Sequence, residues 1–292
     1  MSLVSVMPVA TVARYLKTTD KRLWRIAEHY VALARSQEDF SKITRIGIDE
    51  TASRRGHRYI TNFVDMSSHR VIFCTPGKGS DTIKSFKIDF CAHGGDPDAI
   101  TDVSIDMSAA FIKGITEELP KAKITYDRFH LVKIVSVAVD TVRREEQTEV
   151  SGLKHSRYLW LKNWRNLSYK QQNNLARLRD MNLKTGRAYE MLLAFKHVFL
   201  WNGPKGIKML REWIQWAVRS RLAPMVAAGQ TILRHFDGII NWFTSKVNNG
   251  ILEGLNSLIQ SAKSRARGYR TYRNLITMVY LTVGKLKLAL PT

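Results

Sequence analysis

The sequence predicts an α/β fold: a mixed five-stranded sheet flanked by helices, with a large α-helical insertion and a short N-terminal helix-turn-helix. Three observations predict it. Residues 43–75 contain three runs that are rich in β-branched and aromatic residues. Residues 80–126 alternate between helical and strand patterns, and residues 150–245 are largely helical in pattern. With 45% hydrophobic and 24% charged residues, the 292-residue chain has the composition of a globular protein and can bury a substantial core.

The N-terminal segment, residues 8–34, predicts two short helices about a tight turn. Apolar residues recur at helical spacing before and after an interruption at residues 17–20. Lys21, Arg22 and Arg25 lie near the start of the second helix, where a recognition helix would meet DNA. An ordinary helical hairpin with a solvated basic face is the alternative. On the first interpretation, residues 1–42 form a helix-turn-helix-like DNA-binding segment.

Three strands follow, over residues 43–49, 57–65 and 70–75. Residues 65–69 between the last two provide turn chemistry, so the three strands are expected to form an antiparallel meander.

The next segment alternates helix and strand. We expect a helix over 80–92, a strand over 100–106, a helix over 109–119 that ends at Pro120, and a strand over 123–126. Three antiparallel strands followed by this alternation is the order of the ribonuclease H-like fold. The predicted division is therefore a first part of the ribonuclease H-like core over 43–149, a helical insertion over 150–245, and C-terminal core helices over 246–292.

The net charge of the chain indicates what kind of molecule it binds. Lys and Arg number 46 against 25 Asp and Glu, which gives a net charge of +21 and a pI near 10.1. Such a field attracts polyanions, nucleic acids above all. No apolar run approaches the roughly 18 residues of a membrane span, and no secretory signal is recognisable, so we expect a cytoplasmic, nucleoid-associated protein. Cys74 and Cys91 form neither a zinc-ligand set nor a disulfide framework, and both are predicted to be packing residues.

Two carboxylates mark a candidate metal site. Asp49 and Asp106 each close an apolar strand, and in the predicted fold these strands are neighbours. Two ionised carboxylates at close range repel each other, so such a pair needs either a raised pKa or a cation between them. Mg²⁺ prefers carboxylate oxygens, and two such ions activate the attacking and stabilise the leaving oxygen in phosphoryl transfer. Capping of the following turn is the alternative role for each aspartate.

A third carboxylate, Glu253, lies in a predicted helix whose start is marked by Asn248-Asn249-Gly250. The apolar face of that helix is predicted to comprise Ile251, Leu255, Leu258 and Ile259. Glu253 is either a third metal ligand or a surface residue in a first helical turn, where the helix dipole favours negative charge. Pattern alone leaves both open.

Two basic segments are candidate DNA contacts. A loop beside Asp49 contains Arg54, Arg55, His57 and Arg58. A stripe after the Glu253 helix, interleaved with Tyr269 and Tyr272, contains Lys263, Arg265, Arg267, Arg270 and Arg273. Cations would meet phosphates, and rings would meet sugars or bases. For both segments, a solvated basic surface is the alternative.

Asp127 and His130 follow the fifth predicted strand as Asp-x-x-His. They either form a second shell that orients the site, or Asp127 caps a helix over about 129–144 and His130 lies on its surface. The tryptophans at helical spacing, Trp160 with Trp164 and Trp213 with Trp216, are predicted to be core residues.

Several blocks in register resemble bacterial DDE transposases of the ISL3 insertion-sequence family; they are Gly47–Tyr59, Ile105–Met107, Asp127–His130, Asn249–Asn256 and Gly268–Arg270. The resemblance runs from about residue 8 to 285. It implies a ribonuclease H-like catalytic domain with a helical insertion, and it places the catalytic carboxylates on Asp49, Asp106 and Glu253. It also implies activity on the ends of the family's own element. The cysteine zinc-binding module with which members of that family usually begin is not found in this sequence.

The expected function is therefore metal-dependent DNA strand cleavage and strand transfer at insertion-sequence ends, with two Mg²⁺ ions per site and Mn²⁺ as a substitute. Joining two ends at one target suggests a homodimer or higher oligomer on double-stranded DNA. The alternatives are a catalytically silent or truncated transposase-derived DNA-binding protein, and a related ribonuclease H-like nuclease or resolvase.

Overall fold

The computed structural model describes residues 2–54, 56, 58–245 and 250–290. It divides into two compact units, which we describe separately. The sheet unit comprises Met1–Thr125 and Val247–Thr292, and the helical unit comprises Tyr126–Lys246.

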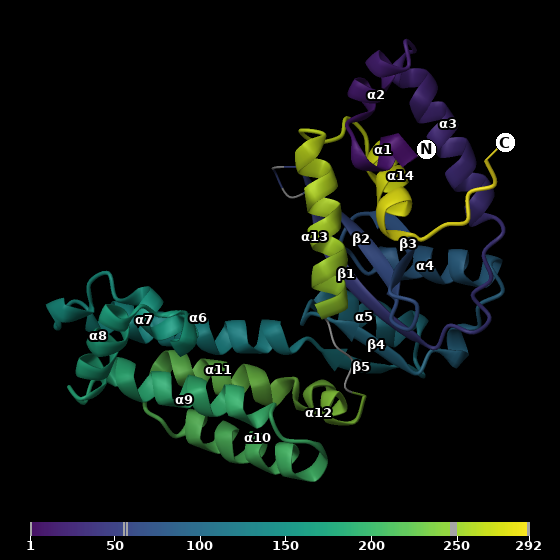
Figure 1. Ribbon diagram of the computed structural model, residues 1–292. Coiled ribbons are helices and arrows are strands. Elements are labelled where there is room, and N and C mark those ends of the chain that lie inside the picture. The colour runs from purple at the N-terminus through teal and green to yellow at the C-terminus, as the bar shows by residue number, and fades with distance from the viewer. Residues whose placement is uncertain (1, 55, 57, 246–249, 291–292) are drawn as a thin grey trace. The chain divides into compact units, whose positions relative to one another are not determined.

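The sheet unit is built on a five-stranded mixed sheet with the order β3-β2-β1-β4-β5 (Figure 1). β1 pairs antiparallel with β2 and parallel with β4, and β2 pairs antiparallel with β3. This is the predicted ribonuclease H-like α/β architecture. The strand bounds are β1 Arg45–Arg54, β2 Arg58–Asp65, β3 Arg70–Pro76, β4 Asp102–Ile105 and β5 Lys123–Tyr126.

One difference from the prediction concerns β1. We expected this strand to end at Asp49, but its antiparallel pairing with β2 continues through Ala52↔Tyr59 to Arg54↔Arg58. Asp49 therefore lies inside β1, and the strand that ends near it is the shorter parallel neighbour β4. Because the strand continues, Arg54 lies roughly 16 Å beyond Asp49 at about 3.3 Å per residue, so the prediction that this arginine lies beside Asp49 was wrong.

Helices cover both faces of this sheet. On one face, α13 and α14 pack over β1, β2 and β3 together with α3, through a core that includes Ile60, Val64, Leu252 and Val279. On the other face, α4 packs on β3 and α5 on α4 (Figure 1). The bounds are α1 Ser2–Val6, α2 Val9–Tyr15, α3 Asp20–Arg35, α4 Asp81–Ala92, α5 Ala109–Glu118, α13 Gly250–Arg265 and α14 Tyr272–Val283.

At the N-terminus, α2 and α3 are separated by a short link, as the sequence predicts. The Thr19 hydroxyl caps α3 by accepting a hydrogen bond from the backbone N–H of Arg22 at 3.3 Å. Leu23 and Ala27 face the interior, whereas Lys21, Arg22 and Arg25 are exposed on the first turns.

The helical unit consists of helices around an aromatic and aliphatic core. Trp160 and Trp213 are buried, as predicted, and the Trp213 indole N–H donates to the Met191 carbonyl at 2.7 Å. Their helical neighbours Trp164 and Trp216 are 44% and 45% exposed, so the prediction that they are core residues was wrong. The bounds are α6 Arg128–Glu146, α7 Arg157–Leu161, α8 Tyr169–Arg179, α9 Lys184–Val198, α10 Gly203–Val218, α11 Ala223–Arg234 and α12 Phe236–Ser245.

The remaining predictions concern the packing of the two cysteines and the presence of a membrane-spanning helix. Cys74 is buried, and burial raises the pKa of its thiol, whereas Cys91 is exposed rather than packed. Within the described residues, no helix has the length and apolar character needed to span a bilayer.

Candidate active site

Asp49 lies in β1, and Asp106 directly follows β4, the parallel neighbour of β1. The register pairs Ile46 with Val103 and Gly47 with Ser104. Continued by two residues, it brings Asp106, just after the end of β4, alongside Asp49 in β1. Both side chains are half-buried. The extended register therefore predicts that the first two candidate carboxylates lie at one level of the sheet.

Asp49 is held on both carboxylate oxygens. Its Oδ1 accepts from the backbone N–H of Glu50 at 2.7 Å, and its Oδ2 accepts from the side-chain amide of Asn256 on α13 at 2.5 Å. The Asn256 Oδ1 in turn accepts from the Thr51 hydroxyl at 2.6 Å and from the Asn62 amide at 3.3 Å. These hydrogen bonds tie α13, β1 and β2 together around Asp49.

Asn256 is a residue of the site to which the sequence assigned no role. It occurs one helical turn after Glu253. The sequence pattern that could have identified it is an amide side chain three residues after a candidate carboxylate, on the same face of the helix. Asn62 could not be found in this way, because its proximity follows from the register of β2 against β1, which pairs it with Asp49.

Glu50 lies next to Asp49 in β1, and strand alternation directs it to the opposite face. Burial raises the pKa of its carboxyl, the negative charge of Asp106 raises it further, Lys78 opposes this, and Asp49 adds a smaller increase. The negative charges of both aspartates thus act on Glu50, although its side chain is directed to the other face of the sheet.

Glu253 lies in the first turn of α13 and is exposed. The neighbouring Leu252 is buried against Gly47 of β1, so closely that a Cβ on Gly47 would lie 2.7 Å from a Leu252 methyl. At i,i+3 spacing, the Cβ atoms of Glu253 and Asn256 are about 5–6 Å apart. Glu253 is therefore beside the residue that holds Asp49.

The apolar face of α13 differs from the prediction. Leu252, Ile259 and Ala262 are its buried residues, Ile251 and Leu255 are partly buried, and Leu258 is 51% exposed. The helix begins at Gly250, and Asn248 and Asn249 fall outside the described residues.

The chemical type of the available donor atoms, which are oxygens, suits a hard divalent cation. Asp49 and Asp106 supply carboxylate oxygens, and the buried Asn62 Oδ1 accepts no hydrogen bond from the described residues, which leaves acceptor capacity next to Asp49. Within the same described residues, no group of three or more His, Cys, Asp or Glu side chains is arranged to hold a metal ion. A site shared by Asp49, Asp106 and Glu253 therefore remains a prediction.

The predicted DNA contacts fall into two groups. Some are already bonded to the protein: Arg54 donates to the Tyr269 carbonyl, Lys263 to Ala52, Arg265 to Val6 and Ser5, and Arg273 pairs with Glu28 at 2.8 Å. Among the described residues, no hydrogen-bond acceptor or carboxylate contacts the side chains of the second group, which are Lys21, Arg22, Arg25, Arg58, Arg267 and Arg270. Arg55 and His57 fall outside the described part of the chain.

Asp127 and His130 belong to the helical unit. Asp127 caps α6 by accepting from the backbone N–H of Phe129 at 3.0 Å, and His130 Nδ1 lies 3.0 Å from Asp127 Oδ2. This agrees with the capping interpretation for Asp127. A second-shell role for the two residues remains a prediction.

A mixed sheet of this order, with aspartates on adjacent parallel strands and a glutamate on a covering helix, defines a ribonuclease H-like protein of the DDE type. Residues 46–279 match the model of the ISL3 DDE family, described as a transposase, and the chain belongs to that family.

Two similar proteins are named as transposases. The chain is 30% identical over 310 residues to the transposase for insertion sequence element IS1557 of Mycobacterium tuberculosis, an alignment that covers 97% of this chain and 66% of that protein. It is 30% identical over 264 residues to the transposase for insertion sequence element IS1001 of Bordetella parapertussis, covering 87% of this chain and 63% of that protein. The chain thus spans slightly less than two thirds of the length of these relatives.

Proposed function

We propose that this protein cleaves DNA strands at the ends of an insertion sequence and joins them to target DNA, in a reaction that depends on divalent metal ions. The observation that carries this proposal is the placement of Asp49 on β1: it lies level with Asp106 and is bonded to α13 through Asn256, one turn from Glu253. The family of the chain and the names of its relatives support the same reaction.

Asp49, Asp106 and Glu253 would hold two Mg²⁺ ions, for which Mn²⁺ can substitute. Two such ions, when bound, supply activation of the attacking oxygen and stabilisation of the leaving oxygen. The protein's own contribution is positioning: Asn256 fixes the rotamer of Asp49, and the hydrogen-bonded Thr51 and Asn62 fix Asn256. The net charge of +21 attracts the double-stranded DNA of element ends and target. Two protomers on paired ends would make the active assembly a homodimer or higher oligomer.

The test measures cleavage and joining separately on a labelled duplex that carries a candidate terminal repeat. Purified wild-type protein is expected to nick the repeat end with Mg²⁺ or Mn²⁺ and to join the freed 3′ end to a second duplex. Asp49→Asn, Asp106→Asn and Glu253→Gln should each lose both steps while still binding the duplex. Lys84→Ala, which removes an exposed charge on α4, should keep both activities. Full cleavage by any of the three carboxylate variants would refute the assignment of that residue.

A DNA-binding protein without cleavage activity is the second candidate. The observation that favours it is the exposed position of Glu253, since three carboxylates are not gathered among the described residues. Metal-independent binding with no cleavage by the wild-type protein would select this candidate. Cleavage without joining would instead indicate a nuclease or resolvase.

A further inference from the structure

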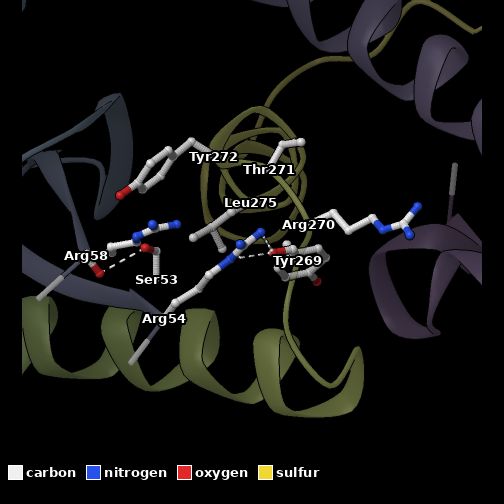
Figure 2. Close-up of a pocket in the computed structure, with 8 residues that line it drawn as sticks. All are labelled: Ser53, Arg54, Arg58, Tyr269, Arg270, Thr271, Tyr272 and Leu275. Atoms are coloured by element: carbon white, nitrogen blue, oxygen red, sulfur yellow. Dashed lines mark hydrogen bonds between the residues drawn. The ribbon is translucent and has the colours of Figure 1, made fainter. Parts of the chain in front are cut away.

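A small cavity lies at the far end of the β1–β2 hairpin in the sheet unit (Figure 2). Arg54 and Arg58 approach it from the two strands, Tyr269 from the segment that leads into α14, and Tyr272 from the start of that helix. Leu275, in the first turns of α14, is one of the buried residues that line it. Arg270 also lines the cavity. The lining therefore combines three arginines, two tyrosines and an apolar residue.

The pairing of β1 with β2 places two positively charged residues opposite each other. Arg54 and Arg58 are register partners across the last rung of the hairpin. Like charges directly opposite each other across two strands are destabilising. Among the described residues, no carboxylate pairs with either side chain, in contrast to the nearby Arg273, which pairs with Glu28. The charge at this hairpin end is therefore not compensated by the described protein.

One of the two guanidinium groups is fixed in place. Arg54 Nη2 and Nε donate to the backbone carbonyl of Tyr269 at 2.7 and 3.2 Å. A carbonyl oxygen orients the guanidinium group without neutralising its charge. Arg54 is thus held ready to bind an anion with little further loss of side-chain freedom, while Arg58 stays available on the opposite strand.

The size of the cavity limits what can enter it. Its volume of about 70 Å³ is several times what one water molecule needs and well below the roughly 300 Å³ at which drug-sized ligand pockets begin. A single phosphate group is of the right order, and a nucleobase with its sugar is not. Arginine is the residue best suited to phosphate, because its planar fork donates two parallel hydrogen bonds.

We propose that Arg54 and Arg58 together bind one backbone phosphate of the DNA. This inference rests on the proposed function and specifies one contact of its substrate. Ser53 of the cavity is four residues from Asp49 along β1, roughly 13 Å at 3.3 Å per residue. The phosphate bound by Arg54 and Arg58 would therefore be a different one from the phosphate at Asp49.

The test uses the salt dependence of DNA binding. The slope of log K against log salt falls by about 0.9 for each phosphate contact that is lost. Full-length wild-type protein, Arg58→Ala, Arg54→Gln and the double variant are titrated with one labelled 30-base-pair duplex at several KCl concentrations. Arg54→Gln is chosen because glutamine can still donate to the Tyr269 carbonyl. Lys84→Ala is the control for loss of an exposed charge elsewhere, and thermal unfolding checks that each variant is folded.

Because both arginines hold the same phosphate, the double variant is expected to lower the slope by about 0.9 in total, and each single variant by no more than that. Arg58→Lys should keep the slope of the wild type but bind more weakly, since it retains the charge and loses the fork.

Three results would overturn the inference. A loss near 1.8 in the double variant would show two independent contacts, and slopes equal to that of Lys84→Ala would show no contact. Stabilisation of the wild type by millimolar inorganic phosphate that Arg58→Ala loses, with DNA slopes unchanged, would show a site for the free anion. A wild-type protein that does not bind the duplex would instead contradict the proposed function itself.

Discussion

The two faces of the central sheet are built from alternate residues of the same strands, and they differ in chemistry. On the α4 side, Phe63 and Phe73 of the sheet pack with Phe86, and the Phe63 and Phe86 rings stack at 4.4 Å. On the α13 side, Asn62, the immediate neighbour of Phe63, joins the hydrogen bonds around Asn256 and Asp49.

One face of the sheet therefore mainly stabilises the fold, and the other mainly positions the side chains of the candidate active site. The aromatic face removes apolar area from water, which stabilises the fold without regard to direction. The polar face consists of directional hydrogen bonds that fix side-chain positions and contribute only about 1 kcal/mol each to stability. Substitutions on the two faces should therefore change different measurements.

The largest effect is expected at the carboxylates. Asp49→Asn, Asp106→Asn and Glu253→Gln should each lower the cleavage rate at least a hundredfold, because metal-ion stabilisation of the transition state is worth several kcal/mol and each 1.36 kcal/mol is about tenfold in rate. Urea unfolding should show a change of no more than about 1 kcal/mol for the two aspartate variants, since each loses a hydrogen bond but also relieves repulsion between carboxylates. A carboxylate variant that unfolds more easily and retains its rate would reverse the roles assigned to the two faces.

The aromatic face gives the next effect. Phe86→Ala should lower the free energy of unfolding by about 3–5 kcal/mol, as is usual when a buried aromatic ring is removed. The cleavage rate per folded molecule should stay unchanged. Ile88→Ala on the same helix, where the side chain is 65% exposed, is the matched control and should change stability by less than about 0.5 kcal/mol. Equal losses in the two variants would show that this face is not the core.

Asn256 should have an intermediate effect on activity. Asn256→Ala removes the donor to Asp49, and loss of such an orienting partner typically costs 10–100-fold in metal affinity or activity. The loss should appear in the cleavage rate and in the Mn²⁺ concentration needed for half-maximal cleavage, with DNA affinity unchanged. Ser257→Ala, one residue further along α13 and exposed, is the control. A variant that cleaves like wild type at low Mn²⁺ would remove Asn256 from the site.

The smallest effect is expected at Gly47, where α13 rests on β1. A Cβ there would meet Leu252 and Met66 at 2.7 Å, but both contacts are the far ends of flexible side chains. Gly47→Ala should therefore lower stability by about 1–3 kcal/mol, the usual cost of overpacking. Because it displaces Leu252, the cleavage rate should fall somewhat further than stability alone explains. Gly254→Ala, which meets no atom within 4 Å, should have neither effect.

Most of the fold could be predicted from the sequence. Alternating β-branched and aromatic residues located the strands to within a few residues, and the order of the elements predicted the sheet order. The end of β1 was missed because polar residues after Asp49, such as Glu50 and Arg54, do not resemble a strand. They remain in one because antiparallel pairing with β2 supplies the backbone hydrogen bonds.

The candidate site was predicted only in part. The order of the strands can be predicted from sequence patterns, and the positions of Asp49 and Asp106 in the sheet follow from that order. The interaction of Asn256 with Asp49, Thr51 and Asn62 joins residues about 200 positions apart, and no local pattern encodes such a contact. The cavity between Arg54 and Arg58 likewise depends on how α14 meets the hairpin, which only the packed structure shows.

The central claim is that Asp49, Asp106 and Glu253 hold metal ions at one place. Replacing Mg²⁺ with Fe²⁺ in the protein–DNA complex and adding ascorbate and peroxide generates hydroxyl radicals at the bound ion, and mass spectrometry locates the breaks in the protein backbone. The account predicts breaks close to residues 49, 106 and 253, all of which disappear in Asp49→Asn. Breaks near 49 and 106 but not near 253, or breaks that persist in Asp49→Asn, would contradict a shared metal site.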